Sequence, residues 1–269
     1  MNNNLPSYNE LPEVFAINLD SIGAITLTGE EQIKYLQGQV TCDVASLAQD
    51  KLLNGAHCNA KGKVFSVFRL FERQGNFLLL QPTSSIEQSL AELKKFGVFA
   101  KVAISQDNEH AYLALAGQQA SVKIAELFQQ VPDNLTPVIH ENNTTVLYIA
   151  GNVSRYIIID NAKKIAEISA TLNIAVYSNA VWDLLEISAG FPLLSQQHVA
   201  EYVPQMLNLQ AINGISFTKG CYLGQETVAR MQYLGKNKRA LFALTGKDMM
   251  ANVGDIIEKK LGENWRKAG

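Results

Sequence analysis

The segment KGCYLGQE (219–226) places a thiol between two glycines, next to a cation and just ahead of two long polar side chains. The residues that follow it are good helix formers as far as Gly235, so we expect a short helix that begins near Leu223. Cys221 would then lie at a helix N-terminus, where unpaired backbone N–H groups, the helix dipole and the neighbouring Lys219 favour a thiolate. The chemistry that this segment predicts is that of a nucleophilic cysteine.

Two interpretations of Cys221 stay open at this point. A free cysteine is often a small, buried core residue. A turn with glycines on both sides, flanked by Lys, Gln and Glu, is better suited to a site, because glycine lets the backbone approach a ligand closely. Gln225 and Glu226 would hold the loop or accept hydrogen bonds from a ligand, and Glu226 would also complement the helix dipole.

Nucleophilic catalysis by a thiol needs a base within reach, most often a histidine. The four histidines are scattered along the chain, and the sequence places none of them beside Cys221; they are His57, His110, His140 and His198. The sequence therefore leaves the nucleophile without an identified base.

The whole motif, Lys219-Gly220-Cys221-Tyr222-Leu223-Gly224-Gln225-Glu226, resembles the signature of the tRNA-modifying protein YgfZ family. These are bacterial folate-binding proteins related to the aminomethyltransferase (T-protein) of the glycine cleavage system. Further segments similar to that family cover nearly the whole chain: KYLQGQVTCDV (34–44), AHCNAKGKV (56–64), LKKFGVFAKV (93–102), ISAGFP (187–192), VPQMLNLQAINGISF (203–217) and GENWRKAG (262–269).

The resemblance implies that tetrahydrofolate or another folate binds in a central cavity, with Trp182 on its wall and Cys221 at its mouth. A folate needs a flat apolar wall for the pterin, a polar group for its donor edge and cations for its glutamate tail. Trp182 lies on an expected helix over 179–189, and from the residues alone a core tryptophan is an equally good interpretation.

The chain departs from its relatives at three positions. Ile22 stands where relatives of this family often have a second tryptophan, and Ser188 stands where the aminomethyltransferases have a glutamate used on the pterin edge. Glu186 is two residues earlier, and we expect it to point elsewhere. Ser66 occupies the position of the catalytic aspartate of those transferases, so we do not expect T-protein activity.

A locally basic run follows the motif and consists of Arg230, Lys236, Lys238 and Arg239. These cations suit an anionic folate tail or RNA phosphates, although such runs are usually solvated faces. The net charge of −2 and the isoelectric point near 6.1 argue against a protein whose whole surface binds nucleic acid. Direct tRNA binding is therefore the least favoured interpretation.

The composition is that of an ordinary water-soluble protein, with 269 residues, 47% hydrophobic and 18% charged. Three widely spaced cysteines, Cys42, Cys58 and Cys221, predict neither a disulfide framework nor a metal site. The N-terminus lacks the features of a signal peptide, and no apolar run is long enough to span a membrane. We expect a monomer in the reducing cytoplasm.

Strands and helices are mixed without a regular βαβ alternation, and several strands follow one another directly, which favours an α+β fold. We expect strands over 14–19, 24–28, 52–59, 64–72, 77–81, 101–105, 111–116, 145–150, 155–160 and 173–177. We expect helices over 30–37, 84–97, 118–130, 162–172 and 179–189. A capping box at Ser84 would open the second of these helices, and 131–137 is the clearest loop.

The resemblance implies two parts: a large mixed α/β folate-binding domain of aminomethyltransferase type over 1–235, and the start of a small C-terminal β-barrel over 236–269. Residues 239–244 and 255–260 have the pattern of strands. Two or three strands cannot close a barrel. We therefore expect this second part to be incomplete, with the barrel truncated at Gly269.

The function that the resemblance implies is that of a folate-binding accessory protein, involved in tRNA modification and in the maintenance of iron–sulfur enzymes. The alternative is a folate-dependent one-carbon transferase, of the aminomethyl type, that uses Cys221. Without the aspartate at position 66, the accessory role is the better interpretation. A single unpaired cysteine could not hold an iron–sulfur cluster alone, since such clusters need several thiolates.

Overall fold

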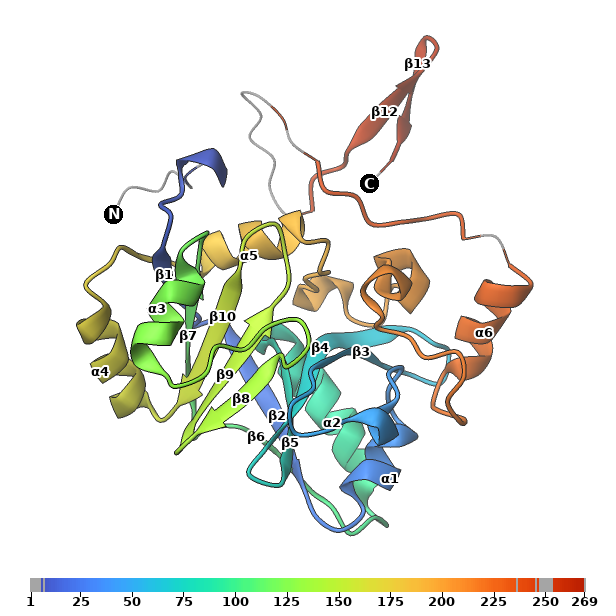
Figure 1. Cartoon of the computed structure of the whole chain (residues 1–269). Helices are drawn as coiled ribbons and strands as arrows, with labels where there is room; N and C mark the ends of the chain where they lie inside the picture. The colour runs from blue at the N-terminus through green and yellow to red at the C-terminus, as the bar shows by residue number, and fades with distance from the viewer. Residues whose placement is uncertain (1–5, 7, 236, 245, 247–253, 269) are drawn as a thin grey trace.

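The computed structural model describes residues 6, 8–235, 237–244, 246 and 254–268. Two β-sheets pack face to face, and helices cover their outer faces (Figure 1). Strands and helices are mixed without βαβ alternation, so the α+β class expected from the sequence is confirmed. Lys236 of the expected basic run lies outside the described residues.

The first sheet has six strands and the second has five. In spatial order the first consists of β11 (Val176–Tyr177), β1 (Phe15–Asn18), β7 (Ala111–Ala116), β10 (Arg155–Asp160), β9 (Thr144–Ile149) and β8 (Val138–Glu141). The second consists of β3 (Leu53–Cys58), β4 (Val64–Arg73), β5 (Asn76–Pro82), β2 (Ile22–Thr28) and β6 (Ala103–Gln106). Neighbouring strands are antiparallel except β1 and β11, which run parallel.

The space between the sheets is the main hydrophobic core. Alternate residues of the strands point into it because successive side chains of a strand face opposite sides; they include Phe15, Ile17, Phe71, Leu78, Leu80, Leu147, Ile157 and Ile159. Helix α5 (Asn179–Ser188) contributes Val181, Trp182 and Leu185 to the same core. The helix that carries Trp182 is thereby fixed against both sheets.

Each outer face of the pair of sheets carries its own helices. The bounds of the remaining helices are α1 (Gln32–Gln37), α2 (Ile86–Gly97), α3 (Ala120–Leu127), α4 (Ala162–Leu172) and α6 (Gln225–Tyr233). Short 3-10 helices occur at Tyr8–Glu10, Val44–Ser46, Thr83–Ser85, Gln196–His198, Pro204–Leu207 and Leu209–Ile212. Helices α1 and α2 bury their apolar sides on the second sheet, and α3 and α4 bury theirs on the first.

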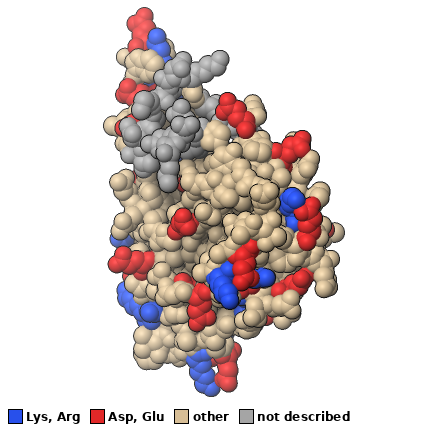
Figure 2. All heavy atoms as spheres, turned by 90° about the vertical axis from the view of Figure 1, so that its left-hand side faces the viewer, with Lys and Arg blue, Asp and Glu red and all other residues tan. Residues whose placement is uncertain are grey.

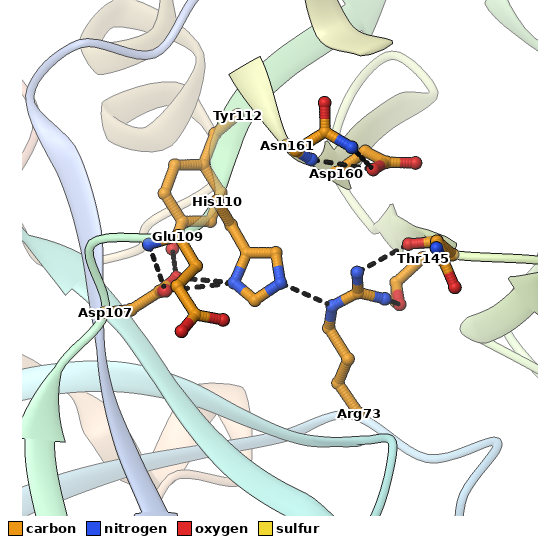
Figure 3. A network of polar contacts seen from close by, with 9 residues as sticks. Arg73, Asp107, Glu109, His110, Tyr112, Thr145, Asp160 and Asn161 are labelled. Atoms are coloured by element: carbon orange, nitrogen blue, oxygen red, sulfur yellow. Dashed lines mark hydrogen bonds and ion pairs between the residues drawn. The ribbon is translucent and has the colours of Figure 1, made fainter. Parts of the chain in front are cut away.

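A polar network also joins the two sheets (Figure 3). Arg73, at the end of β4 in the second sheet, donates through Nη1 to Thr145 Oγ1 of the first sheet at 2.8 Å, and through Nε to His110 Nε2 at 3.1 Å. His110 Nε2 therefore acts as an acceptor, and its Nδ1 donates to the carboxylate of Asp107 at 2.9 Å. Tyr112 donates its hydroxyl to the same carboxylate. Because every member has a partner, this network is a structural link between the sheets.

The elements expected from the sequence are largely present, with four corrections, one of which is an unexpected strand over Asn264–Lys267. Strand β8 was not expected, because it has only four residues. The capping box at Ser84 does not form: Ser84 Oγ donates to the carbonyl of Leu194, and the first helical residue is Ile86. Residues 239–244 are not a strand, since none of them pairs with a neighbouring strand among the described residues.

The last described segment forms a hairpin of β12 (Glu258–Leu261) and β13 (Asn264–Lys267). All of its residues are exposed, and Figure 1 shows it extending away from the two large sheets. The expected boundary at 235/236 and the assignment of 236–269 to a barrel remain predictions, because a two-stranded hairpin is common to many β folds.

Candidate functional site

Cys221 is exposed on its loop, but the loop does not place the thiol on the first turn of a helix. Helix α6 begins at Gln225, and Gly224 is its N-cap residue with φ of 83°. The helix expected to begin near Leu223 is therefore present and begins two residues later, so Cys221 lies four residues before the first helical residue. The reason is the left-handed conformation at Gly224, which ends the extended loop and begins the helix.

Gly224 is required by close packing within the protein. A Cβ atom at this position would lie 2.5 Å from the carbonyl oxygen of Asn59 and 2.8 Å from the Cα of Gly62. The backbone amide of Leu223 also donates to the carbonyl of Gly38 at 3.0 Å. The loop that carries Cys221 is thus held against the turn between β3 and β4, and Gly224 does not serve to admit a ligand.

Lys219 is buried and binds backbone carbonyls. Its Nζ donates to the carbonyl oxygens of Val40 at 2.8 Å and Cys42 at 2.6 Å, and lies 5.1 Å from the ring centre of Tyr222. Burial lowers the pKa of Lys219 to about 8, against the opposing effects of Cys42 and Asp43. Lys219 therefore anchors the loop, and the expected role of its charge beside the Cys221 thiolate has no support in these contacts.

The other members of the motif and of the basic run lie at the surface or in the loop wall. Tyr222 is buried, Gln225 is half-buried, and Gly220 and Glu226 are exposed, with Glu226 in the first turn of α6. Arg230 is exposed in the last turn of α6, and Lys238 and Arg239 are exposed on the segment after it. Arg230 thus lies on a helix, and Lys238 and Arg239 lie on an irregular, solvated segment.

Trp182 lies in a narrow pocket between the two sheets. The pocket is lined by Ile22, Arg69, Leu80, Gln81, Pro82, Ile157, Trp182, Glu186, Phe191 and Leu193. Trp182 and Ile22, which the family resemblance assigns to one site, both line this pocket. Ser188 is not part of the lining; its hydroxyl donates to the carbonyl of Leu185 at 2.9 Å within the last turn of α5.

Glu186 was expected to point away from the site, and this expectation is wrong. It lies one helical turn after Trp182, so both side chains project from the same side of α5 and both line the pocket. The spacing of four residues between them was the signal that could have identified it. Its side chain is 1% exposed, so the stability of its charge depends on the groups that contact the carboxylate.

Two arginines contact the Glu186 carboxylate. Nη2 of Arg69 lies 2.8 Å from Oε2 and 3.0 Å from Oε1, and Nη1 of Arg155 contacts Oε1. Arg69 stacks on the ring of Phe191 with its Cζ 3.7 Å from the ring centre, and Arg155 lies 5.1 Å from the ring centre of Trp182. No composition or spacing signal in the sequence predicted these arginines, because β4, β10 and α5 come together only in the folded chain.

The pocket beside Trp182 does not include Cys221. The thiol is exposed on its loop and is absent from the pocket lining, so the expectation that sulfur and indole line a common hollow is wrong. The indole faces the core between the sheets, whereas Tyr222 and Lys219 bind the Cys221 loop to the region around residues 38–42.

A second buried polar group surrounds Ser66, the position expected to lack a catalytic carboxylate. Ser66 Oγ donates to Ser89 Oγ at 3.2 Å, and His57 Nδ1 lies 2.9 Å from the same Ser89 oxygen. All three side chains are fully buried, and burial lowers the pKa of His57 to about 3. His57 is thus a neutral core residue. His198, whose Nδ1 lies 2.9 Å from Ser195 Oγ, is likewise engaged locally.

Charge and metal-binding groups give no further site. Among the described residues, no group of three or more His, Cys, Asp or Glu side chains is arranged to hold a metal ion. No helix in the described part of the chain is both long enough and apolar enough to cross a membrane. Figure 2 shows acidic and basic side chains intermixed on the face of α3 and α4, consistent with the pairs Lys123–Glu126 and Lys164–Glu167.

Comparison with curated proteins finds close relatives over nearly the full chain. The tRNA-modifying protein YgfZ of Colwellia psychrerythraea is 62% identical over 266 residues, which is 98% of this chain and 82% of that protein. The tRNA-modifying protein YgfZ of Yersinia enterocolitica is 42% identical over 264 residues, 97% of this chain and 80% of that protein. A search against protein-family models gives no match.

Among solved structures, the fold is similar to that of the glycine cleavage system aminomethyltransferase T from Bartonella henselae. The TM-score is 0.62 at 15% sequence identity, and the match covers 82% of this chain and 63% of that one. At this level of identity the likeness concerns the fold alone. It confirms the aminomethyltransferase-type architecture that the sequence motif implied.

Proposed function

The chain belongs to the tRNA-modifying protein YgfZ family, and from this premise we propose that it is a folate-binding accessory protein with a role in tRNA modification. The observation that carries the ligand assignment is the pocket between the sheets, where an indole, aliphatic side chains and an arginine that bonds to other described residues only through Nη2 meet. We propose that it supports iron–sulfur enzymes that modify tRNA and works as a monomer in the cytoplasm.

The residues of this pocket fit a reduced folate in their chemistry. Trp182, Ile22 and Phe191 offer apolar and aromatic surface for a pteridine ring, and Arg69 offers hydrogen-bond donors. The volume of the pocket is about 10 Å³, which is room for about one water molecule. A pteridine ring therefore needs one wall to move.

The wall that can move is the segment after α5. It contributes Phe191 and Leu193, has no regular secondary structure between α5 and Gln196, and begins at Gly190 with a φ of 71°. The opposite walls are strands β4, β5 and β10, which belong to the two sheets, and helix α5, which packs on both sheets. Binding of a folate would thus displace Phe191 and leave Arg69 and Trp182 in place.

A bound reduced folate supplies one-carbon chemistry, and this chain's own residues hold it. In this proposal Trp182 gives the ring an apolar face and the Glu186 carboxylate keeps Arg69 oriented. Cys221 has a separate place at the surface, where its thiol is open to a partner protein or a small molecule.

The alternative function is a one-carbon transferase that uses Cys221. The observation in its favour is that the Cys221 thiol is exposed, so a substrate can reach it. Incubation with tetrahydrofolate and an aminomethyl or formaldehyde donor tests this. If product forms with the unmodified chain but not with Cys221→Ser, the protein is an enzyme and the accessory role is wrong.

Titration with tetrahydrofolate tests the leading proposal. Trp265 is 61% exposed, so a Trp265→Phe background leaves Trp182 as the only indole reporter. We expect saturable quenching of the Trp182 emission, and weaker binding by calorimetry in Trp182→Leu. If tetrahydrofolate does not bind to the Trp265→Phe protein or to the unmodified chain, the proposal is wrong.

A further inference from the structure

The ion cluster beside Trp182 contains an excess of positive charge in direct contact. Two guanidinium groups, from Arg69 and Arg155, share one carboxylate from Glu186, and all three side chains are at least nine-tenths buried. Asp183, one turn earlier on α5, pairs with Asn179 and is not part of the pocket lining. A buried cation without a full complement of acceptors is costly, so this cluster favours a ligand atom that accepts hydrogen bonds or carries negative charge.

Arg69 is the arginine that can offer donors to such a ligand. Its hydrogen bonds to other described residues all come from Nη2 and go to Glu186, which leaves the N–H groups of Nε and Nη1 without a partner in the described part of the chain. The side chain is 7% exposed and lines the pocket. Arg155 differs: it is 1% exposed, its Nη2 donates to the carbonyl of Ala150 at 2.8 Å, and its buried Nε has no hydrogen-bond partner among the described residues, so it adds to the unmet donor capacity of the cluster but does not line the pocket.

The position of Arg69 on a central strand makes it a defined recognition element. It projects from β4, between β3 and β5, and is held at one edge by Glu186 and over one face by Phe191. A guanidinium has five N–H donors in a fixed plane and no acceptor. It therefore favours an oxygen in the ligand and disfavours an amino group at the same place.

We propose that Arg69 is the specificity-determining residue of this pocket and donates hydrogen bonds to an acceptor oxygen of the bound folate. This inference rests on the proposed function, because it takes the ligand to be a folate. The oxygen has two sources in that ligand: the 4-oxo group of the pterin ring, or a carboxylate of the glutamate tail. In either case, movement of Phe191 makes room beside the Arg69 guanidinium for a ligand oxygen to reach the N–H groups at its edge.

Calorimetric titration of the whole chain with four probes distinguishes the two sources. The probes are tetrahydrofolate, its 4-amino analogue tetrahydroaminopterin, 6-methyltetrahydropterin, which has no tail, and p-aminobenzoylglutamate, which has no pterin. The variants are Arg69→Met and Arg69→Lys, with Lys164→Met as a control that removes an exposed cation on α4. Arg69→Met leaves Arg155 and Glu186 as a neutral pair, so we expect it to fold, and Arg69→Lys keeps the charge without the planar donors.

We expect tetrahydrofolate to bind at least about tenfold more weakly to Arg69→Met than to the unmodified chain, as befits loss of a hydrogen bond to a charged group. If the 4-oxo group is the acceptor, the unmodified chain prefers tetrahydrofolate to the 4-amino analogue, and Arg69→Met loses this preference. If the tail is the acceptor, Arg69→Met weakens p-aminobenzoylglutamate binding and leaves the preference between the two pterins unchanged. Either pattern supports the proposal.

Two other results would overturn it. The first is that folded Arg69→Met and Arg69→Lys bind all four probes with unchanged affinity, as Lys164→Met does. This result would refute the role of Arg69 and leave the proposed function intact. A lack of tetrahydrofolate binding by the unmodified chain would refute the proposed function and this inference together.

Discussion

Replacing Glu186 with glutamine removes the carboxylate that both buried guanidinium groups contact. Arg69 and Arg155 then remain in the same low-dielectric region without a direct anionic partner. Burial is the main cause that lowers the pKa of Arg69, and the proximity of Arg155 lowers it further, against the opposing effect of Glu186. We expect this single change to be among the most destabilising that retain side-chain volume.

The expected size follows from the burial of the group. Removing one partner of a buried ion pair costs about 3–5 kcal/mol, and Glu186 is 1% exposed with two such partners. Because glutamine retains one acceptor oxygen, we expect a loss near the lower end, about 3 kcal/mol of unfolding free energy. For a chain of this size, each kcal/mol lowers the midpoint of thermal unfolding by roughly 2–4 °C.

Urea denaturation followed by circular dichroism measures the effect, with two matched variants. Glu126→Gln makes the same chemical change in the exposed pair with Lys123, where we expect less than about 1 kcal/mol. Arg69→Met leaves Arg155 and Glu186 paired, so it should destabilise less than Glu186→Gln. If Glu186→Gln is as mild as Glu126→Gln, or milder than Arg69→Met, the excess-charge argument is wrong.

Three further predictions concern groups outside this cluster. In the native protein, a thiol reagent should label Cys221 quickly and leave Cys42 and Cys58 unlabelled, because these two are buried and burial raises their pKa values. Cys221→Ser should remove the fast phase of labelling. Fast labelling of two thiols would contradict the burial of Cys42 and Cys58. Because burial lowers the pKa of His57 to about 3, the unfolded chain binds a proton below pH 6.5 that the folded chain does not. Unfolding free energy should therefore fall by up to about 1.4 kcal/mol per pH unit from this group as the pH drops from 6.5 towards 3, and an unchanged pH slope in His57→Gln would refute this. Arg73→Met breaks the link between the sheets shown in Figure 3 and should cost about 3 kcal/mol in urea denaturation, whereas a loss below about 1 kcal/mol would show that the network is dispensable.

The sequence was a good guide to local structure because the periodicity of apolar residues is set by which face of an element is buried. Strands β4, β5 and β10 and helices α4 and α5 lie within a few residues of their expected bounds. The errors arose where a short element had little pattern, as in β8, or where exposed residues mimicked a strand, as over 239–244.

The site was predicted less well than the fold. Trp182 and Ile22 line one pocket, but the sequence did not indicate that Glu186, Arg69 and Arg155 meet beside them. A charged residue in a sequence is expected to be solvated. Only packing can reveal that three such residues are buried against one another.

By itself the sequence determined the α+β class, the family and the glycine-flanked motif around Cys221, because these depend on local pattern and on a contiguous motif. The tertiary structure alone decided that Lys219 anchors that loop, that the thiol and the indole lie in different places, and that Arg69 lines a pocket and binds Glu186. The physical reason is that burial and hydrogen-bond partners are properties of residues far apart in the chain, which meet only when the two sheets pack together.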